Sequence, residues 1–267
     1  EGATVLPFSP KASAAISRRL LQTILHEEFN IKARNLEDEI AKKAIIAGKH
    51  VFIEKPLTET LEQAEELVAL SQKHNVKVQV GHVERYNPAI RSLRNIDFKP
   101  KFIEGHRLAL FNPRGTDVSV VLDLMIHDLD IVLSMIKEDV VDVRANGVCI
   151  VSKTPDICNA RIEFAGGAIA NLTASRISLK NMRKIRIFQN DAYISLDFLE
   201  KEAQVVKIEE NVENDDFSGM TIHTNDGLKR IIIDSPEIMK NNAIEDELSD
   251  FYNAVTGQSD VLVTIDD

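Results

Sequence analysis

Cysteine is scarce in this sequence, which holds two in 267 residues, Cys149 and Cys158. Their spacing matches no metal-binding motif, and so few thiols are typical of a chain that stays reduced. We therefore expect a cytoplasmic protein that uses neither disulfide bonds nor a cysteine-based metal site.

Long apolar runs are missing too. No stretch approaches the roughly 18 apolar residues that a membrane-spanning helix needs. The first residues also lack the charged and apolar regions of a signal peptide. We therefore expect no membrane-spanning segment, no signal peptide and no membrane partner.

Positive charge is in deficit: 32 Lys and Arg residues stand against 42 Asp and Glu residues, a net charge of −10. This balance argues against nucleic acid or an anionic membrane as the main partner. The sequence also has no G-x-G-x-x-G turn, no phosphate-binding loop, and no Ser or Cys in a nucleophile elbow. An anionic ligand must therefore be held by a local group of Arg and Lys side chains.

What is present suits a globular protein of two domains or one large one, with 44% hydrophobic and 28% charged residues. Before residue 100 the expected elements are strands at 3–6, 51–53 and 76–80 and helices at 14–29, 36–47 and 60–75. Later helices are expected at 118–136 and 244–256, among strands at 102–111, 140–151, 160–164, 168–174, 185–188, 193–198, 203–208 and 230–233. Runs of strands after a βα section predict an α/β fold whose second domain has a mainly antiparallel sheet.

Polar residues follow the ends of expected strands. The apolar run 51–53 is typical of a buried strand in a parallel sheet, and it leads directly into Glu54, Lys55 and Pro56. Ligands of open α/β sheets lie beyond the carboxyl ends of the strands. A surface ion pair at a strand end is the alternative. The strand expected at 168–174 leads to Arg176, which is a candidate contact for an anion.

A polar loop follows the strand at 76–80. It carries His82, Glu84 and Arg85 and leads to Asn87, a good N-cap for the helix after it. Ionisable side chains beside a helix N-terminus are typical of binding sites. A solvated loop is the alternative.

The apolar helix expected at 118–136 carries Asp123, His127 and Asp130 at spacings that put them on one face. A histidine between two carboxylates is held in orientation and is suited to proton transfer. Asp128 falls outside this stripe and is expected to be solvated. The alternatives are a solvated stripe and a metal site, which no second His or Cys cluster completes.

Three segments in this order resemble the Gfo/Idh/MocA family of NAD(P)-dependent oxidoreductases: residues 44–57 (AIIAGKHVFIEKPL), residues 81–88, and Asp123-x-x-x-His127-x-x-Asp130. The resemblance extends from residue 41 to the C-terminus. It implies a Rossmann domain that binds NAD or NADP, then an α/β domain whose open sheet pairs subunits into a homodimer or homotetramer. The run 82–89 further resembles the sugar-nucleotide members, UDP-N-acetylglucosamine 3-dehydrogenases among them.

The resemblance also implies residue roles. Lys55 matches the lysine that contacts the substrate hydroxyl and the nicotinamide, His127 the catalytic histidine, and Asp123 the aspartate one turn before it. Residues implied at the cofactor are Glu54, Lys55, Pro56, His82 and Arg85. Residues implied at the substrate are Glu84, Arg85, Asn87 and Asp123. Arg176, from its position after a strand, is expected to join them at the substrate.

The implied activity is hydride transfer between NAD(P) and a hydroxyl or keto carbon of a sugar or sugar nucleotide, without a metal. The alternatives are a non-catalytic sensor of dinucleotide or sugar on the same scaffold and a pure assembly module. A sensor has no need of a proton acceptor, so the joint presence of Lys55, Asp123 and His127 disfavours it.

We expect residues 1–87 to form a partial Rossmann domain and residues 88–267 the substrate-binding and oligomerisation domain, with the helix at 244–256 packing back on the first. Only 53 residues precede Glu54, whereas each βαβ unit takes roughly 30 or more. We therefore expect this sequence to omit stretches of the natural protein.

Overall fold

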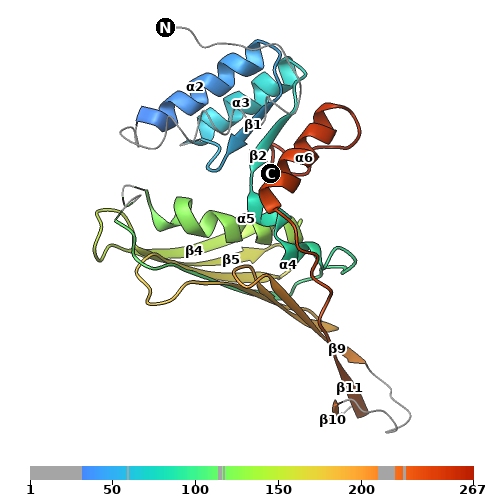
Figure 1. Cartoon of the computed structure of the whole chain (residues 1–267). Helices are drawn as coiled ribbons and strands as arrows, with labels where there is room; N and C mark the ends of the chain where they lie inside the picture. The colour runs from blue at the N-terminus through green and yellow to red at the C-terminus, as the bar shows by residue number, and fades with distance from the viewer. Residues whose placement is uncertain (1–31, 59, 114–115, 117, 210–219, 225–226) are drawn as a thin grey trace. The chain divides into compact units, whose positions relative to one another are not determined.

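The computed structural model describes residues 32–267 except 59, 114–115, 117, 210–219 and 225–226 (Figure 1). The elements expected at 3–6 and 14–29 lie outside the described residues. Two compact units divide the chain, with the boundary between Val83 and Glu84. Residues 242–267 belong to the first unit, and Glu84–Asn241 form the second.

The first unit is a small α/β layer. Strands β1 (Val51–Glu54) and β2 (Val78–Gly81) pair in parallel. Its helices are α2 (Lys32–Ile46), α3 (Leu61–Lys73) and α6 (Ala243–Val255). The helix α6 contacts β1 through Phe251, whose ring centroid lies 5.9 Å from that of Phe52.

Local sequence signals account for the ends of α2 and α3. Gly48 follows α2 with a φ of +70°, and its N–H bonds to the carbonyl of Ile45, as glycine does after a helix. Thr60 and Gln63 form a capping box at the start of α3, which satisfies two N–H groups that the helix itself leaves open.

The second unit is built on a nine-stranded sheet in the order β10-β11-β9-β8-β7-β3-β6-β5-β4. The strands are β3 (Phe102–Leu108), β4 (Val140–Val148), β5 (Ile157–Phe164), β6 (Ile169–Ser175), β7 (Met182–Phe188), β8 (Ala192–Asp197), β9 (Glu202–Glu209), β10 (Met220–Thr224) and β11 (Gly227–Asp234). Every pairing is antiparallel except β3 with β6. The predicted α/β fold with a mainly antiparallel sheet is confirmed.

One face of this sheet is covered by the helix α5 (Ile126–Met135), as Figure 1 shows. Burial alternates along β3, so that Ile103 and Arg107 are buried on the helix side. The helix adds Ile131 and Val132, both fully buried, to the core. Two short helices, η1 (Val83–Tyr86) and α4 (Pro88–Arg91), complete the unit.

The uninterrupted helix predicted at 118–136 is wrong in its first part. Residues Val121–Met125 form a π-helical turn, η2, and regular α-helix begins only at Ile126. A π turn takes up more residues than an α turn, and such turns occur often at functional sites.

None of the described helices combines the length and the apolar character that crossing a membrane requires.

Candidate active site

The predicted residues Glu54, Lys55 and Pro56 stand where β1 ends. Strands β1 and β2 run side by side, and Glu54 is the register partner of Gly81. Lys55 and Pro56 are half-buried, whereas Glu54 is exposed. The two strand ends therefore present a carboxylate and an amine at the edge where an α/β sheet binds its ligands.

Gly81 allows the Glu54 side chain to lie against β2. A Cβ atom at position 81 would come within 2.7 Å of Glu54 Oε2 and 3.0 Å of Glu54 Cα. Because one of these contacts is with backbone, no side-chain rotation relieves both. The glycine is thus required for the close packing that holds the carboxyl end of β1.

The residues of the first unit that are predicted to contact the nicotinamide lie at these strand ends. The side chain of Glu54 lies against Gly81, and His82, which is half-buried, directly follows β2. The contact of Glu54, Lys55, Pro56 and His82 with the nicotinamide stays a prediction. The sequence contains no glycine-rich turn for a pyrophosphate, so no residue of this chain is assigned to that part of the cofactor.

In the second unit, Glu84 of η1 is buried and fully engaged. Its Oε1 accepts from Arg107 at 2.9 Å and from Arg183 at 3.4 Å, and its Oε2 accepts from Asn87 Nδ2 at 2.9 Å. Asn87 also donates to the carbonyl of Phe198 and caps α4 by accepting from Ala89 N. These contacts support a structural role for Glu84 and Asn87, and their contact with substrate stays a prediction.

The prediction that Asp128 is solvated is wrong. Its side chain is 3% exposed, and its Oδ1 accepts from Arg107 Nε at 3.0 Å and from Arg107 Nη2 at 2.7 Å. Arg107 reaches it from β3, on the sheet face that α5 covers. The spacing of residues within a helix cannot show that a side chain on that helix pairs with a residue of a different element.

Arg85 and Asp130 form a second ion pair. The guanidinium donates through Nε to Asp130 Oδ2 and through Nη2 to Asp130 Oδ1, both at 2.7 Å. Such a two-bond pair fixes the plane of the guanidinium. Asp130 therefore orients Arg85, which the sequence predicts at the cofactor and the substrate.

Asp123 and His127 lie on either side of the junction between η2 and α5. Asp123 is exposed in the π turn, and His127 is half-buried in the first turn of α5. In a regular helix, residues four apart lie on the same face, but the π turn shifts Asp123 from that alignment. The histidine is the more enclosed of the two.

Arg176 is buried and donates to the carbonyls of Val118 and Pro155. Its Nε lies 3.8 Å from Asp156 Oδ1. These contacts hold the segment that leads into η2, and the binding of substrate by Arg176 stays a prediction.

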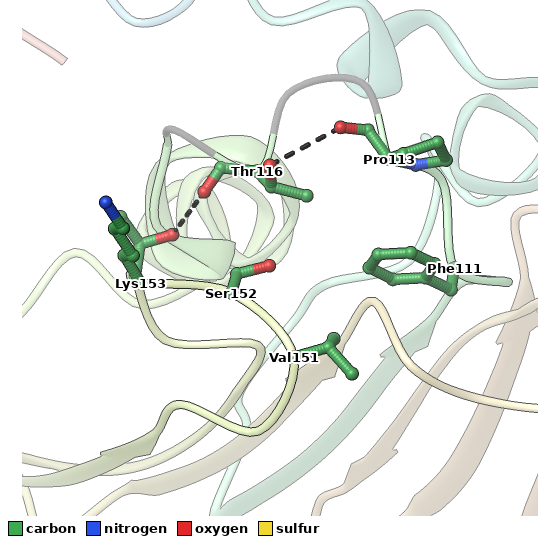
Figure 2. Close-up of a pocket in the computed structure, with 7 residues that line it drawn as sticks. Phe111, Pro113, Thr116, Val151, Ser152 and Lys153 are labelled. Atoms are coloured by element: carbon green, nitrogen blue, oxygen red, sulfur yellow. Dashed lines mark hydrogen bonds between the residues drawn. The ribbon is translucent and has the colours of Figure 1, made fainter.

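A hollow of about 530 Å³ opens beside this segment. Figure 2 shows the ring of Phe111 on one side and Lys153 on the other. Thr154 ties its two rims together by donating to the carbonyls of Thr116 and Val118. An aromatic ring, hydroxyl groups and an ammonium group can receive a ligand with both a flat apolar part and an anionic part. Sequence reasoning missed this hollow, because its rims come from two loops far apart in the sequence, one before η2 and one after β4.

The predicted residues thus fall into two sets. Glu54, Lys55, Pro56 and His82 belong to the first unit; Glu84, Arg85, Asn87, Asp123, His127 and Arg176 belong to the second. Among the described residues, no three His, Cys, Asp or Glu side chains gather in a way that could hold a metal ion.

Two family profiles match the chain. The profile of the oxidoreductase family with an NAD-binding Rossmann fold matches residues 30–82, and that of the GFO/IDH/MocA C-terminal domain matches residues 99–195. The first match lies within the first unit of the structure, and the second match lies within the second unit.

The chain is also similar to individual proteins. It is 35% identical over 223 residues to UDP-N-acetylglucosamine 3-dehydrogenase of Acidithiobacillus ferrooxidans, covering 83% of this chain and 67% of the relative. A solved structure of that enzyme superposes with a TM-score of 0.76 at 30% identity, over 94% of this chain and 81% of the other. The scyllo-inositol 2-dehydrogenase (NAD(+)) of Bacillus subtilis is 30% identical over 151 residues, covering 51% of this chain and 44% of the relative.

Proposed function

The chain belongs to the Gfo/Idh/MocA family of oxidoreductases, and on that premise we propose that it moves hydride between NAD(P) and a sugar nucleotide. The proposed reacting position is the 3-position of UDP-N-acetylglucosamine. The observation that carries this proposal is the 35% identity over 223 residues to an enzyme named for that reaction.

Bound NAD(P) supplies the acceptor for the hydride, and the protein must supply an acceptor for the hydroxyl proton. We assign that proton to Lys55 or His127. The half-burial of both side chains supports the assignment, because a proton acceptor works best where bulk water is kept away from the reacting carbon.

Arg85 is proposed to contact the cofactor or the substrate. Support comes from its pair with Asp130, which holds the guanidinium plane with two bonds of 2.7 Å. A guanidinium held in this way keeps its remaining N–H groups in a fixed direction. Glu84 and Asn87 are proposed to hold the conformation of the loop that carries Arg85. Asp123 is proposed to act beside His127.

An absorbance assay at the nicotinamide band tests the function directly. UDP-N-acetylglucosamine, UDP-N-acetylgalactosamine, UDP-glucose and scyllo-inositol are each offered with NAD and with NADP. We expect reduction of the cofactor with UDP-N-acetylglucosamine and weaker or no signal with the other three. Binding of cofactor and sugar nucleotide by calorimetry without any reduction would favour the non-catalytic sensor instead.

We further propose that copies of the chain associate through the uncovered sheet face. The aromatic side chains of Phe102, Phe188 and Tyr193 form a row across β3, β7 and β8, with centroids 6.0 and 5.1 Å apart. Phe188 is 40% exposed in the single chain. An aromatic row on an open sheet is the kind of surface that protein interfaces bury.

A further inference from the structure

Two strings of ion pairs connect α5, the helix that carries His127, with the turn η1. The direct string is the Asp130–Arg85 pair, with both bonds at 2.7 Å. The indirect string runs from Asp128 to Arg107 of β3 at 2.7 Å, and from Arg107 to Glu84 of η1 at 2.9 Å. Helix, strand and turn are therefore joined in a closed circuit.

The indirect string is almost entirely removed from water. The side chains of Arg107, Asp128 and Glu84 are 3%, 3% and 7% exposed. The guanidinium reaches one carboxylate with Nε and Nη2 and the other with Nη1. Arg183 adds a second positive charge against Glu84 at 3.4 Å, so the cluster is balanced in charge.

Stability alone does not account for such a cluster. Apolar residues of similar volume often replace a buried ion pair with no loss of stability, because the charges must be stripped of water. What the charged version provides is one defined geometry, since each bond has a fixed length and direction. The circuit is therefore suited to holding α5 at one rotation about its axis.

His127 is placed to benefit from that constraint. It directly precedes Asp128 and lies three residues before Asp130, so both anchored carboxylates are within one turn of the imidazole. They project in different directions, about 160° apart around the helix axis. Anchors on two sides fix the rotation of the helix, and hence the direction of the side chain between them.

We propose that Asp128 and Arg107 are positioning residues for His127: their buried pair, joined through Glu84 to η1, sets the direction in which α5 presents the imidazole. This inference rests on the proposed function, in which His127 meets the substrate. Arg107 lies outside the three segments that resemble the family, and Asp128 occupies an unspecified position in the third.

The first test is Asp128→Asn in the full chain, with UDP-N-acetylglucosamine and NAD as the probes. We expect kcat to fall by about 10- to 100-fold, the scale of a small misplacement of a reacting group. The KM for the sugar nucleotide and the Kd for NAD stay near the wild-type values. In two-dimensional NMR, the ring signals of His127 shift or broaden. Unchanged kcat and unchanged ring signals would overturn the proposal.

A double-variant cycle separates positioning from general weakening. If Asp128 acts through His127, Asp128→Asn costs little further turnover once His127→Ala has removed the imidazole. The same fold-loss in both backgrounds contradicts the proposal. If His127→Ala alone keeps wild-type turnover, the catalytic assignment of His127 fails, and the NMR readout then judges the positioning by itself.

Asp197→Asn is the matched control. Asp197 is a carboxylate of the same unit, 11% exposed and paired with Lys184 at 3.0 Å across β7 and β8. We expect it to leave kcat and the His127 signals unchanged. If Asp128→Asn fails to fold, Arg107→Lys keeps the charge but loses the forked geometry; the same selective loss of kcat is expected there, and its absence would overturn the proposal.

Discussion

Arg107 and Asp128 form a buried ion pair in which two guanidinium nitrogens, Nε and Nη2, share one carboxylate oxygen at 3.0 and 2.7 Å. The two residues are 21 positions apart and come from a strand and from the helix that covers it. Their contact joins the core of the second unit to the helix that carries His127.

Removing one partner of this pair is expected to destabilise the protein strongly. Asp128→Asn leaves Arg107 with less compensating charge in a site without water, so the free energy of unfolding should fall by about 3–5 kcal/mol. Urea denaturation measures the change. Asp142→Asn, which breaks the exposed pair with Arg144, should change it by less than about 1 kcal/mol; equal losses in both variants would contradict the account.

Acid stability should depend on Asp156. Burial raises the pKa of this carboxyl, but the N–H groups of Ser152, Ile150 and Val151, at 2.7 to 2.9 Å from Oδ2, outweigh burial and hold the pKa well below its usual range. A carboxyl whose pKa is lowered by folding stabilises the protein fully above its pKa in the unfolded chain, about 4. This stabilisation is lost as the pH falls toward the pKa of the carboxyl in the folded protein.

The corresponding experiment compares unfolding of the wild type and Asp156→Asn between pH 7 and pH 2, by denaturant titration at each pH. The wild type should lose more stability than the variant below about pH 4, so the two curves converge. Parallel curves over the whole range would show that the Asp156 carboxylate is not favoured by the fold.

Gly81→Ala should impair both stability and turnover. The new Cβ would come within 3.0 Å of Glu54 Cα, so β1 must move, at an expected cost of about 1–3 kcal/mol. Because Lys55 follows Glu54 directly, kcat should fall as well. Thermal unfolding and the absorbance assay measure the two effects. Gly166→Ala, whose Cβ would meet only the Glu138 carboxylate, is the control and should leave turnover intact.

Phe188→Glu should convert the proposed oligomer to a single chain. A charge in the aromatic row of Phe102, Phe188 and Tyr193 would have to lose its water on association, which is unfavourable. Light scattering after gel filtration reports the mass. Leu179→Glu, at a residue that is 95% exposed, is the control. Association of Phe188→Glu as tight as that of the wild type would reject this face as the interface.

Features set by neighbouring residues could be predicted from the sequence. The predicted Asn87 cap depends on a few adjacent positions and is confirmed. The capping box of Thr60 and Gln63 and the turn at Gly48 likewise depend only on adjacent positions. The alternation of apolar residues likewise located the central strands of the second unit. In each case the cause lies within the segment itself.

Features set by distant residues could not be predicted. Asp128 was expected in solvent because nothing in its own helix indicates Arg107. The sequence analysis missed the strand β10, because the order of this strand comes from its pairing with β11. The parallel pairing of β3 with β6 inside an otherwise antiparallel sheet also depends on the whole topology.

The proposal that Lys55 or His127 accepts the hydroxyl proton is tested most directly by single-turnover kinetics with UDP-N-acetylglucosamine and NAD. In Lys55→Met and in His127→Asn, we predict that hydride transfer slows by about 100-fold or more, while the Kd for NAD, measured by fluorescence, changes far less. Near-normal hydride transfer in both variants would contradict the account.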